Sequence, residues 1–120
     1  MTKYTGQLDT MMWYGGEMGF GDFREVAKPH QKINRAFSSD KAALAYAYSI
    51  VNKSANKKPK NQYSKGIQYV VYIKNTETGR DYHIQLNKGK VRVWTTGPEG
   101  YRLGYLLKSD GTISYRGGLI

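Results

Sequence analysis

The end of a strand and the start of the main helix are expected within the stretch Arg35-Ala-Phe-Ser-Ser-Asp-Lys-Ala-Ala-Leu-Ala-Tyr-Ala-Tyr-Ser-Ile50. Ser38 or Ser39 can accept hydrogen bonds from the first free N–H groups of a helix, and Asp40 would lie at its positive end. The alanines that follow favour helix, and their small side chains suit packing flat on a sheet. The sequence therefore predicts a short strand that ends at the serines and a helix over about 40–51.

The rest of the chain has the pattern of strands. Beyond residue 66, apolar and polar residues alternate with period two, and glycine-containing turns bound each run. Strands are expected at 8–16, 20–26, 36–38, 67–73, 81–86, 91–95, 101–107 and 112–116, with loops at 27–34 and 52–66. The expected fold class is α+β: a small antiparallel or split β-sheet with one main helix (about 40–51) and a C-terminal strand meander, in a single domain over 1–120.

The composition excludes several kinds of site. The 120 residues include no cysteine, which removes disulfides, thiolate metal sites and a cysteine nucleophile. The two histidines, His30 and His83, are too few and too far apart in sequence to predict a metal site. No apolar run is long enough to span a bilayer, and the first residues lack an apolar signal segment. We expect a cytoplasmic protein without metal or membrane contacts, in the host cytoplasm if it is viral.

The net charge of +10 is concentrated in the second part of the chain. Residues 1–40 hold five Lys/Arg and five Asp/Glu, whereas residues 41–120 hold fourteen Lys/Arg and four Asp/Glu. Such a field favours polyanions, meaning nucleic acid, nucleotide phosphates or an acidic protein surface. The alternative is a solvated surface that only keeps the protein soluble. The candidate phosphate contacts are Lys53, Lys57, Lys58, Lys60, Lys65, Arg92 and Arg102.

Two segments resemble motifs of the ADP-ribosyltransferase superfamily: Trp13-Tyr-Gly-Gly16, and the stretch from Arg35 to Tyr46. In small members of this family, a strand of the type aromatic-His-Gly-Ser/Thr leads into the NAD pocket. A later strand of the type Tyr-Phe-Ala/Ser is followed by a helix carrying Lys, Ala and Tyr. The resemblance covers residues 11–50 and implies an NAD cofactor in a cleft between the two segments.

The resemblance also implies roles for single residues. Tyr14 stands where the family has the His that hydrogen-bonds the NAD ribose, and Glu99 is the candidate for the late catalytic acid. Ala36 or Phe37 stands where the family has a ring stacked on nicotinamide. The implied cofactor-binding residues are Trp13, Tyr14, Gly15, Gly16, Phe37, Ser38, Ser39 and Tyr46. The implied activity is transfer of ADP-ribose to a macromolecule, with the basic surface as the docking face.

Two other functions fit the same residues. A basic, tyrosine-rich sheet could bind nucleic acid or an acidic protein partner without catalysis, as small phage-type accessory or anti-defence proteins do. Seven of the eleven tyrosines are interleaved with Lys and Arg in the strand half, which is typical of surfaces that stack bases: Tyr63, Tyr69, Tyr72, Tyr82, Tyr101, Tyr105 and Tyr115. They also suit strand positions whose rings are half buried. A ribonuclease toxin that uses His83 for acid–base catalysis is the third possibility.

Overall fold

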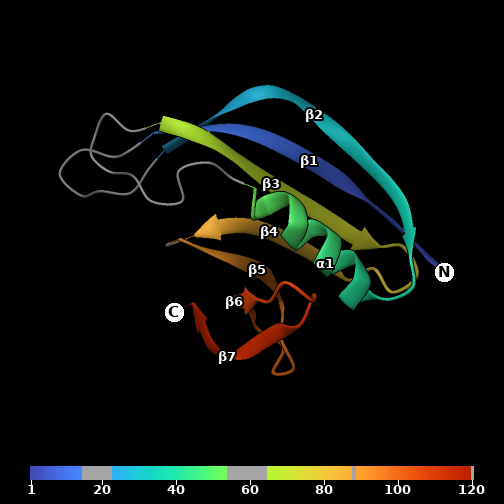
Figure 1. Cartoon of the computed structure of the whole chain (residues 1–120). Helices are drawn as coiled ribbons and strands as arrows, with labels where there is room; N and C mark the ends of the chain where they lie inside the picture. Colours follow the sequence, from blue (N-terminus) through green and yellow to red (C-terminus); the bar gives the residue numbers. More distant parts are fainter. Residues whose placement is uncertain (15–22, 54–64, 88, 120) are drawn as a thin grey trace.

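A computed structural model describes the backbone of residues 1–14, 23–53, 65–87 and 89–119, and side chains at 1–11, 31–53, 68–87 and 89–115. Within these residues the chain forms one seven-stranded antiparallel sheet, in the order β2-β1-β3-β4-β5-β6-β7, and one helix, α1 (Figure 1). The elements are β1 (Thr2–Tyr14), β2 (Phe23–Phe37), α1 (Asp40–Val51), β3 (Lys65–Asn75), β4 (Asp81–Asn87), β5 (Lys90–Thr96), β6 (Arg102–Leu107) and β7 (Ile113–Leu119). The expected α+β fold with one main helix and a C-terminal meander is confirmed.

The helix lies where the strand order requires a crossing connection. Both β2 and β3 pair antiparallel with β1, so they run in the same direction with β1 between them. Strands that run the same way must be joined by a chain that returns along the sheet, and α1 provides part of that return. It crosses one face of the sheet in front of β3 and β4 (Figure 1).

The start of α1 follows from its first residues. Ser39 has extended backbone, with φ −162°, and its side chain accepts a 3.1 Å hydrogen bond from the backbone N–H of Ala42. Of the two serines proposed as the cap, Ser39 is therefore the one that acts, and the predicted bounds 40–51 are confirmed. The buried side chains Ala43, Leu44, Ala47 and Val51 share one face of the helix and pack against the sheet.

The sheet has a helix-covered face and a helix-free face. In β4 and β5 buried and partly exposed residues alternate, as the period-two pattern predicts. The helix-covered face holds the core, including Tyr4, Val71, Ile73, Tyr82, Ile84, Leu86, Val91, Val93, Tyr105 and Leu107. The helix-free face carries the other half of each strand, including Tyr72, Asp81, His83, Arg92 and Trp94.

The predicted loop over 27–34 is wrong, because these residues belong to the long strand β2. Pro29 and the polar character of the segment gave the wrong prediction. β2 is an edge strand, and its pairing with β1 shifts register next to this proline, between the pairs Leu8–Gln31 and Thr10–Lys28. An edge strand with a bulge tolerates a residue that has no N–H. Residues 23–26 and 36–37 of the strands expected at 20–26 and 36–38 are the two ends of this one element, and residues 20–22 lie outside the described residues.

Candidate functional site

The two segments that resemble the transferase motifs lie at opposite ends of β1. Thr2 pairs with Phe37, which precedes the helix, whereas Trp13 and Tyr14 pair with Arg24 and Phe23 at the other end of the hairpin. Eleven residues of strand separate the two ends, or about 36 Å at roughly 3.3 Å per residue. The backbone of 13–14 is placed in β1, while Gly15 and Gly16 lie outside the described residues. The expected NAD cleft between the two segments is therefore not formed by the parts of these segments that are described.

The candidate acid is also far from Tyr14. Glu99 is exposed in the turn between β5 and β6. That turn follows Thr96, near the end of the sheet where Tyr4 pairs with Asn75, and Tyr14 pairs with Lys65 at the other end of β3. The transferase reading stays a prediction, and the geometry brings its two provisional catalytic residues to opposite ends of the molecule.

The helix-side residues of that motif pack against one another. The rings of Phe37 and Tyr46 are 5.3 Å apart, and the Arg35 guanidinium lies 4.4 Å from the centroid of the Tyr46 ring. Ser39 caps the helix and Ser38 is exposed. These contacts hold α1 against the end of β2. They give Arg35, Phe37 and Tyr46 a structural role that needs no ligand.

Sequence reasoning missed the role of Asp40 as an anchor. Its carboxylate accepts hydrogen bonds from the hydroxyls of Tyr4 and Tyr82 and a 2.8 Å hydrogen bond from Nδ2 of Asn75. Burial alone would raise the pKa of Asp40, but these three hydrogen bonds and the charge of Arg80 outweigh it and lower the pKa. Burial and the carboxylate raise the pKa of both tyrosines. The ionised carboxylate thus ties the first turn of α1 to β1, β3 and β4.

A row of aromatic side chains crosses the helix-free face. Tyr72 on β3 pairs with His83 on β4, and His83 pairs with Trp94 on β5. The Tyr72 and His83 rings meet edge-to-face with their centroids 6.3 Å apart. All three side chains are half-buried, so each keeps part of its ring exposed to solvent. We call Tyr72, His83 and Trp94 the aromatic row.

The next strand is shaped to receive the last member of this row. Gly104 on β6 pairs with Trp94, and a Cβ built at Gly104 would come within 2.7 Å of the indole Cε2 atom. The indole thus occupies the space that any other residue at 104 would fill with its side chain. Any residue other than glycine at 104 would push the indole out of this position.

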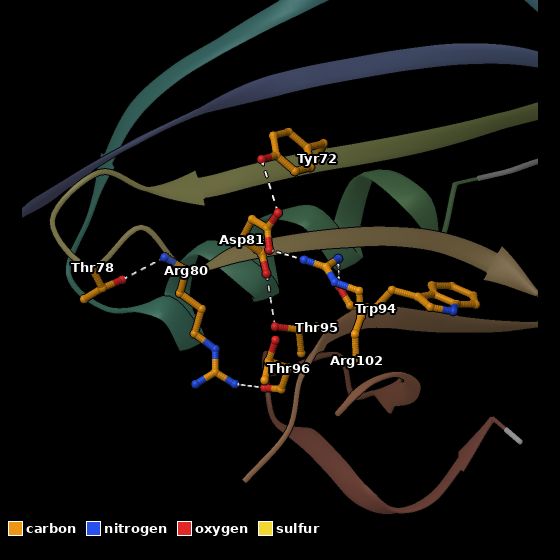
Figure 2. A network of polar contacts seen from close by, with 8 residues as sticks. All are labelled: Tyr72, Thr78, Arg80, Asp81, Trp94, Thr95, Thr96 and Arg102. Atoms are coloured by element: carbon orange, nitrogen blue, oxygen red, sulfur yellow. Dashed lines mark hydrogen bonds and ion pairs between the residues drawn. The ribbon is translucent and has the colours of Figure 1, made fainter. Parts of the chain in front are cut away.

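An ion pair flanks the row at one side (Figure 2). Figure 2 shows the Asp81 carboxylate between Tyr72, whose hydroxyl donates to it over 3.4 Å, and the Arg102 guanidinium. Arg102 also donates to the backbone oxygen of Trp94 over 3.5 Å. Its side chain remains 47% exposed, so this cation can still meet a ligand. Arg80 donates to the carbonyl of Thr96, which fixes the neighbouring strand ends.

Arg92 flanks the row at the other side and has unused hydrogen-bond donors. It pairs with Gln85 and Leu106, two residues along β5 from Trp94 and on the same face. Its Nε and Nη1 atoms are buried and have no hydrogen-bond partner among the described residues. A buried donor without a partner costs about 1–3 kcal/mol, so these N–H groups would be stabilised by an oxygen acceptor once the guanidinium turned toward solvent.

His83 is neutral at neutral pH. Burial lowers its pKa below 6.5, Arg102 acts in the same direction, and the charges of Asp9 and Asp81 oppose it. Within the described chain no hydrogen bond joins its ring to a carboxylate that would orient it as a catalytic base. The ribonuclease function stays a prediction, and no carboxylate in the described chain is hydrogen-bonded to His83 to support it. His83 contributes a neutral ring to the aromatic row.

The basic residues predicted to meet phosphate divide into three groups. Arg92 and Arg102 both lie on the helix-free face beside the aromatic row. Lys53 follows the end of α1, and Lys65 begins β3 at the end of the sheet near Tyr14. The remaining predicted contacts, Lys57, Lys58 and Lys60, lie outside the described residues. The structure thus brings together the two arginines of the predicted set.

Comparison with known proteins gives no relative from which a role could be carried over. No protein-family model, no curated protein and no solved structure matches the chain. In the described part of the chain, no three His, Cys, Asp or Glu residues are grouped as a metal site would need. In the part of the chain that the structure describes, no helix has the length and apolar character needed to cross a membrane. The side-chain geometry is therefore the basis for function.

Proposed function

We propose that the chain is a non-enzymatic protein that binds single-stranded nucleic acid on the helix-free face of its sheet. The observation that supports this most strongly is the aromatic row with two arginines beside it: Arg102, whose side chain is 47% exposed, and Arg92, whose Nε and Nη1 atoms have no partner among the described residues. Arg102 can donate to a phosphate oxygen next to a base stacked on the indole, and the Arg92 guanidinium would have to turn toward solvent to donate to a second phosphate. Guanidinium groups suit this contact because their planar fork matches phosphate oxygens.

The aromatic row supplies the contact with bases. Three half-buried rings on adjacent strands offer surfaces on which bases can stack, and a stacked base contributes about 1–3 kcal/mol. Sheets that carry exposed aromatics on neighbouring strands are a known solution for single-stranded RNA. The Trp94 ring already packs against Gly104 in the free protein. Stacking a base on it therefore costs little additional side-chain entropy.

A single strand fits this face better than a duplex. Reading the major groove needs a protruding helix or a two-stranded ribbon, whereas the aromatic row lies on a broad sheet. Bases paired inside a duplex would also not present their faces to the rings. The net charge of +10 adds attraction for any polyanion, and the rings then favour the unpaired strand.

The proposal is tested by fluorescence anisotropy with a labelled oligothymidine of about twelve nucleotides, which lies within the sites of about 4–16 nucleotides known for OB-fold domains that bind single strands. We expect Trp94→Ala to weaken binding by roughly 5- to 150-fold, the equivalent of one lost stacking contact. We expect Arg92→Gln to weaken it and to reduce the slope of log K against log salt by about 0.7, the value for one phosphate contact on a single strand.

Matched variants serve as controls. Tyr115→Ala removes an exposed ring that packs on Tyr105 at the helix-covered face, and Arg35→Gln removes a cation that stacks on Tyr46. Both should leave affinity and salt slope close to those of the unchanged protein. Equal losses in the control and test variants would contradict the proposed surface, and so would tighter binding to the corresponding duplex.

A further inference from the structure

A carboxylate lies inside the surface proposed to bind nucleic acid. Asp81 precedes His83 by two residues on β4, so its side chain is on the same face of the sheet as the aromatic row. A negative charge at this place repels phosphate groups. Any favourable contribution of Asp81 to binding would therefore have to come from hydrogen bonds that its oxygens accept.

The carboxylate is held in place and is still open to solvent. Figure 2 shows it accepting a hydrogen bond from the hydroxyl of Tyr72 and an ion-paired contact from the Arg102 guanidinium. Among the described residues, these two side chains are the donors to it. An ionised carboxylate has about four acceptor positions, and the Asp81 side chain is 33% exposed. Acceptor positions therefore remain for a donor that arrives from solvent.

Cations lie on both sides of this carboxylate. Lys74 pairs with Asp81 on the neighbouring strand β3 and is exposed. Arg102, on β6, pairs with Thr96, and its side chain is 47% exposed. The aromatic row is one step further along the same strands and on the same face. The surface thus presents rings at one level, and a carboxylate flanked by two cations at the next.

This order of groups matches the order of groups in a nucleotide. The ribose joins the base to the phosphate, so a base on the row and a phosphate at Lys74 or Arg102 would bring the ribose between them close to Asp81. A ribose carries a 2′-hydroxyl that can donate a hydrogen bond, and deoxyribose does not. Carboxylates accept such a hydrogen bond from the ribose in dinucleotide-binding sites.

We propose that Asp81 accepts a hydrogen bond from a ribose 2′-hydroxyl, so that the helix-free face binds single-stranded RNA in preference to single-stranded DNA. This inference rests on the proposed function, because it concerns the same surface. It names the class of nucleic acid, which the rings and the cations alone do not select: both stack bases and attract phosphates in either polymer.

The test is fluorescence anisotropy with three labelled strands of about twelve uracil nucleotides. One has ribose, one has deoxyribose, and one has 2′-fluororibose, which keeps the ribose-like sugar conformation but has no O–H donor. We expect the unchanged protein to bind the ribose strand about three- to tenfold more tightly than either of the others, the equivalent of one hydrogen bond.

Variants locate the source of this preference. Asp81→Ala should bind the three strands with equal affinity, because the acceptor is absent. Asp81→Asn should keep part of the preference, because its amide oxygen is a weaker, uncharged acceptor. The matched control is Asp110→Ala, which removes an exposed carboxylate that lies 3.9 Å from the amino group of Lys41 on α1. This control should keep the full preference for the ribose strand.

Three results would overturn the role of Asp81 while the proposed function stands. They are equal binding of the ribose and deoxyribose strands, binding of the 2′-fluoro strand as tight as that of the ribose strand, and an unchanged preference in Asp81→Ala. The second result would assign the preference to sugar conformation, and the third would assign it to another residue. Failure of all three strands to bind would contradict the nucleic-acid surface itself, and this inference with it.

Discussion

Replacing Gly104 by alanine tests whether the position of Trp94 matters for binding. A Cβ at 104 would lie 2.7 Å from indole Cε2 and 2.9 Å from Cζ2 and Nε1. Carbon atoms in contact are separated by about 3.5–4.0 Å, so the ring must move away by roughly 1 Å or rotate about its side-chain bonds. The backbone at 104 does not need to change, because the obstructing atoms belong to a side chain.

The effects on stability and on binding should differ in size. Displacing the ring lowers the free energy of unfolding by about 1–3 kcal/mol. The substitution offsets about 0.5–1 kcal/mol of this loss, because alanine has less conformational freedom than glycine in the unfolded chain. We expect a net loss of about 1 kcal/mol in the free energy of unfolding. Affinity for the oligothymidine should fall by roughly 5- to 30-fold, because the displaced ring no longer stacks fully with its base.

The assay combines urea denaturation with anisotropy, and Gly97→Ala is the matched control. A Cβ at Gly97 would meet the hydroxyl of Tyr105, which belongs to the core on the other face. This control should lose at least as much stability while it keeps its affinity for the oligothymidine. Unchanged affinity in a folded Gly104→Ala protein would refute the reasoning, and so would the same loss of affinity in both variants.

Three further outcomes are expected. Asp40→Asn should lower the free energy of unfolding by about 2–4 kcal/mol in urea denaturation, because the buried hydroxyls of Tyr4 and Tyr82 lose a charged acceptor. Because the folded pKa of Asp40 is lowered, its contribution is complete above about pH 4 and is lost as pH falls through that lower pKa, so an acid titration of the variant should lack this step. Asp81→Asn should strengthen oligothymidine binding by about two- to fivefold at low salt, because Arg102 loses its carboxylate partner. The lowered pKa of His83 predicts that affinity for the oligothymidine is constant above pH 6.5 and rises at lower pH, where protonation adds a cation. A maximum of affinity above pH 7 would contradict this.

The helix and the meander could be predicted because their signals are local. The serine cap and alanine run fix α1 within a few residues, and period-two alternation places Asp81, His83 and Gln85 on one side of β4. The edge strand β2 could not be predicted in this way. A strand that is solvated along one edge needs few apolar residues, so its polar sequence with a proline is indistinguishable from a loop.

The candidate site depends on register between strands, which alternation alone does not determine. Tyr72, His83 and Trp94 are separated by eleven residues at each step, and a turn lies midway in each interval. That constant spacing was the signal that could have identified the row in advance. Gly104 carried no such signal, because its role appears only where an indole on the neighbouring strand covers it. The described parts of the two transferase-like segments, Trp13–Tyr14 and Arg35–Phe37, do not converge, because they lie at the two ends of one long hairpin.

The most direct measurement is a series of ¹H–¹⁵N correlation NMR spectra of the ¹⁵N-labelled protein, recorded during titration with unlabelled oligothymidine. We predict that the largest shifts fall on the indole Nε1–H of Trp94, the guanidinium Nε–H of Arg92 and the amides of β3 to β6 that surround them. Shifts confined to α1 and the helix-covered face, or a spectrum that does not change at saturating oligothymidine, would contradict a binding surface on the helix-free face.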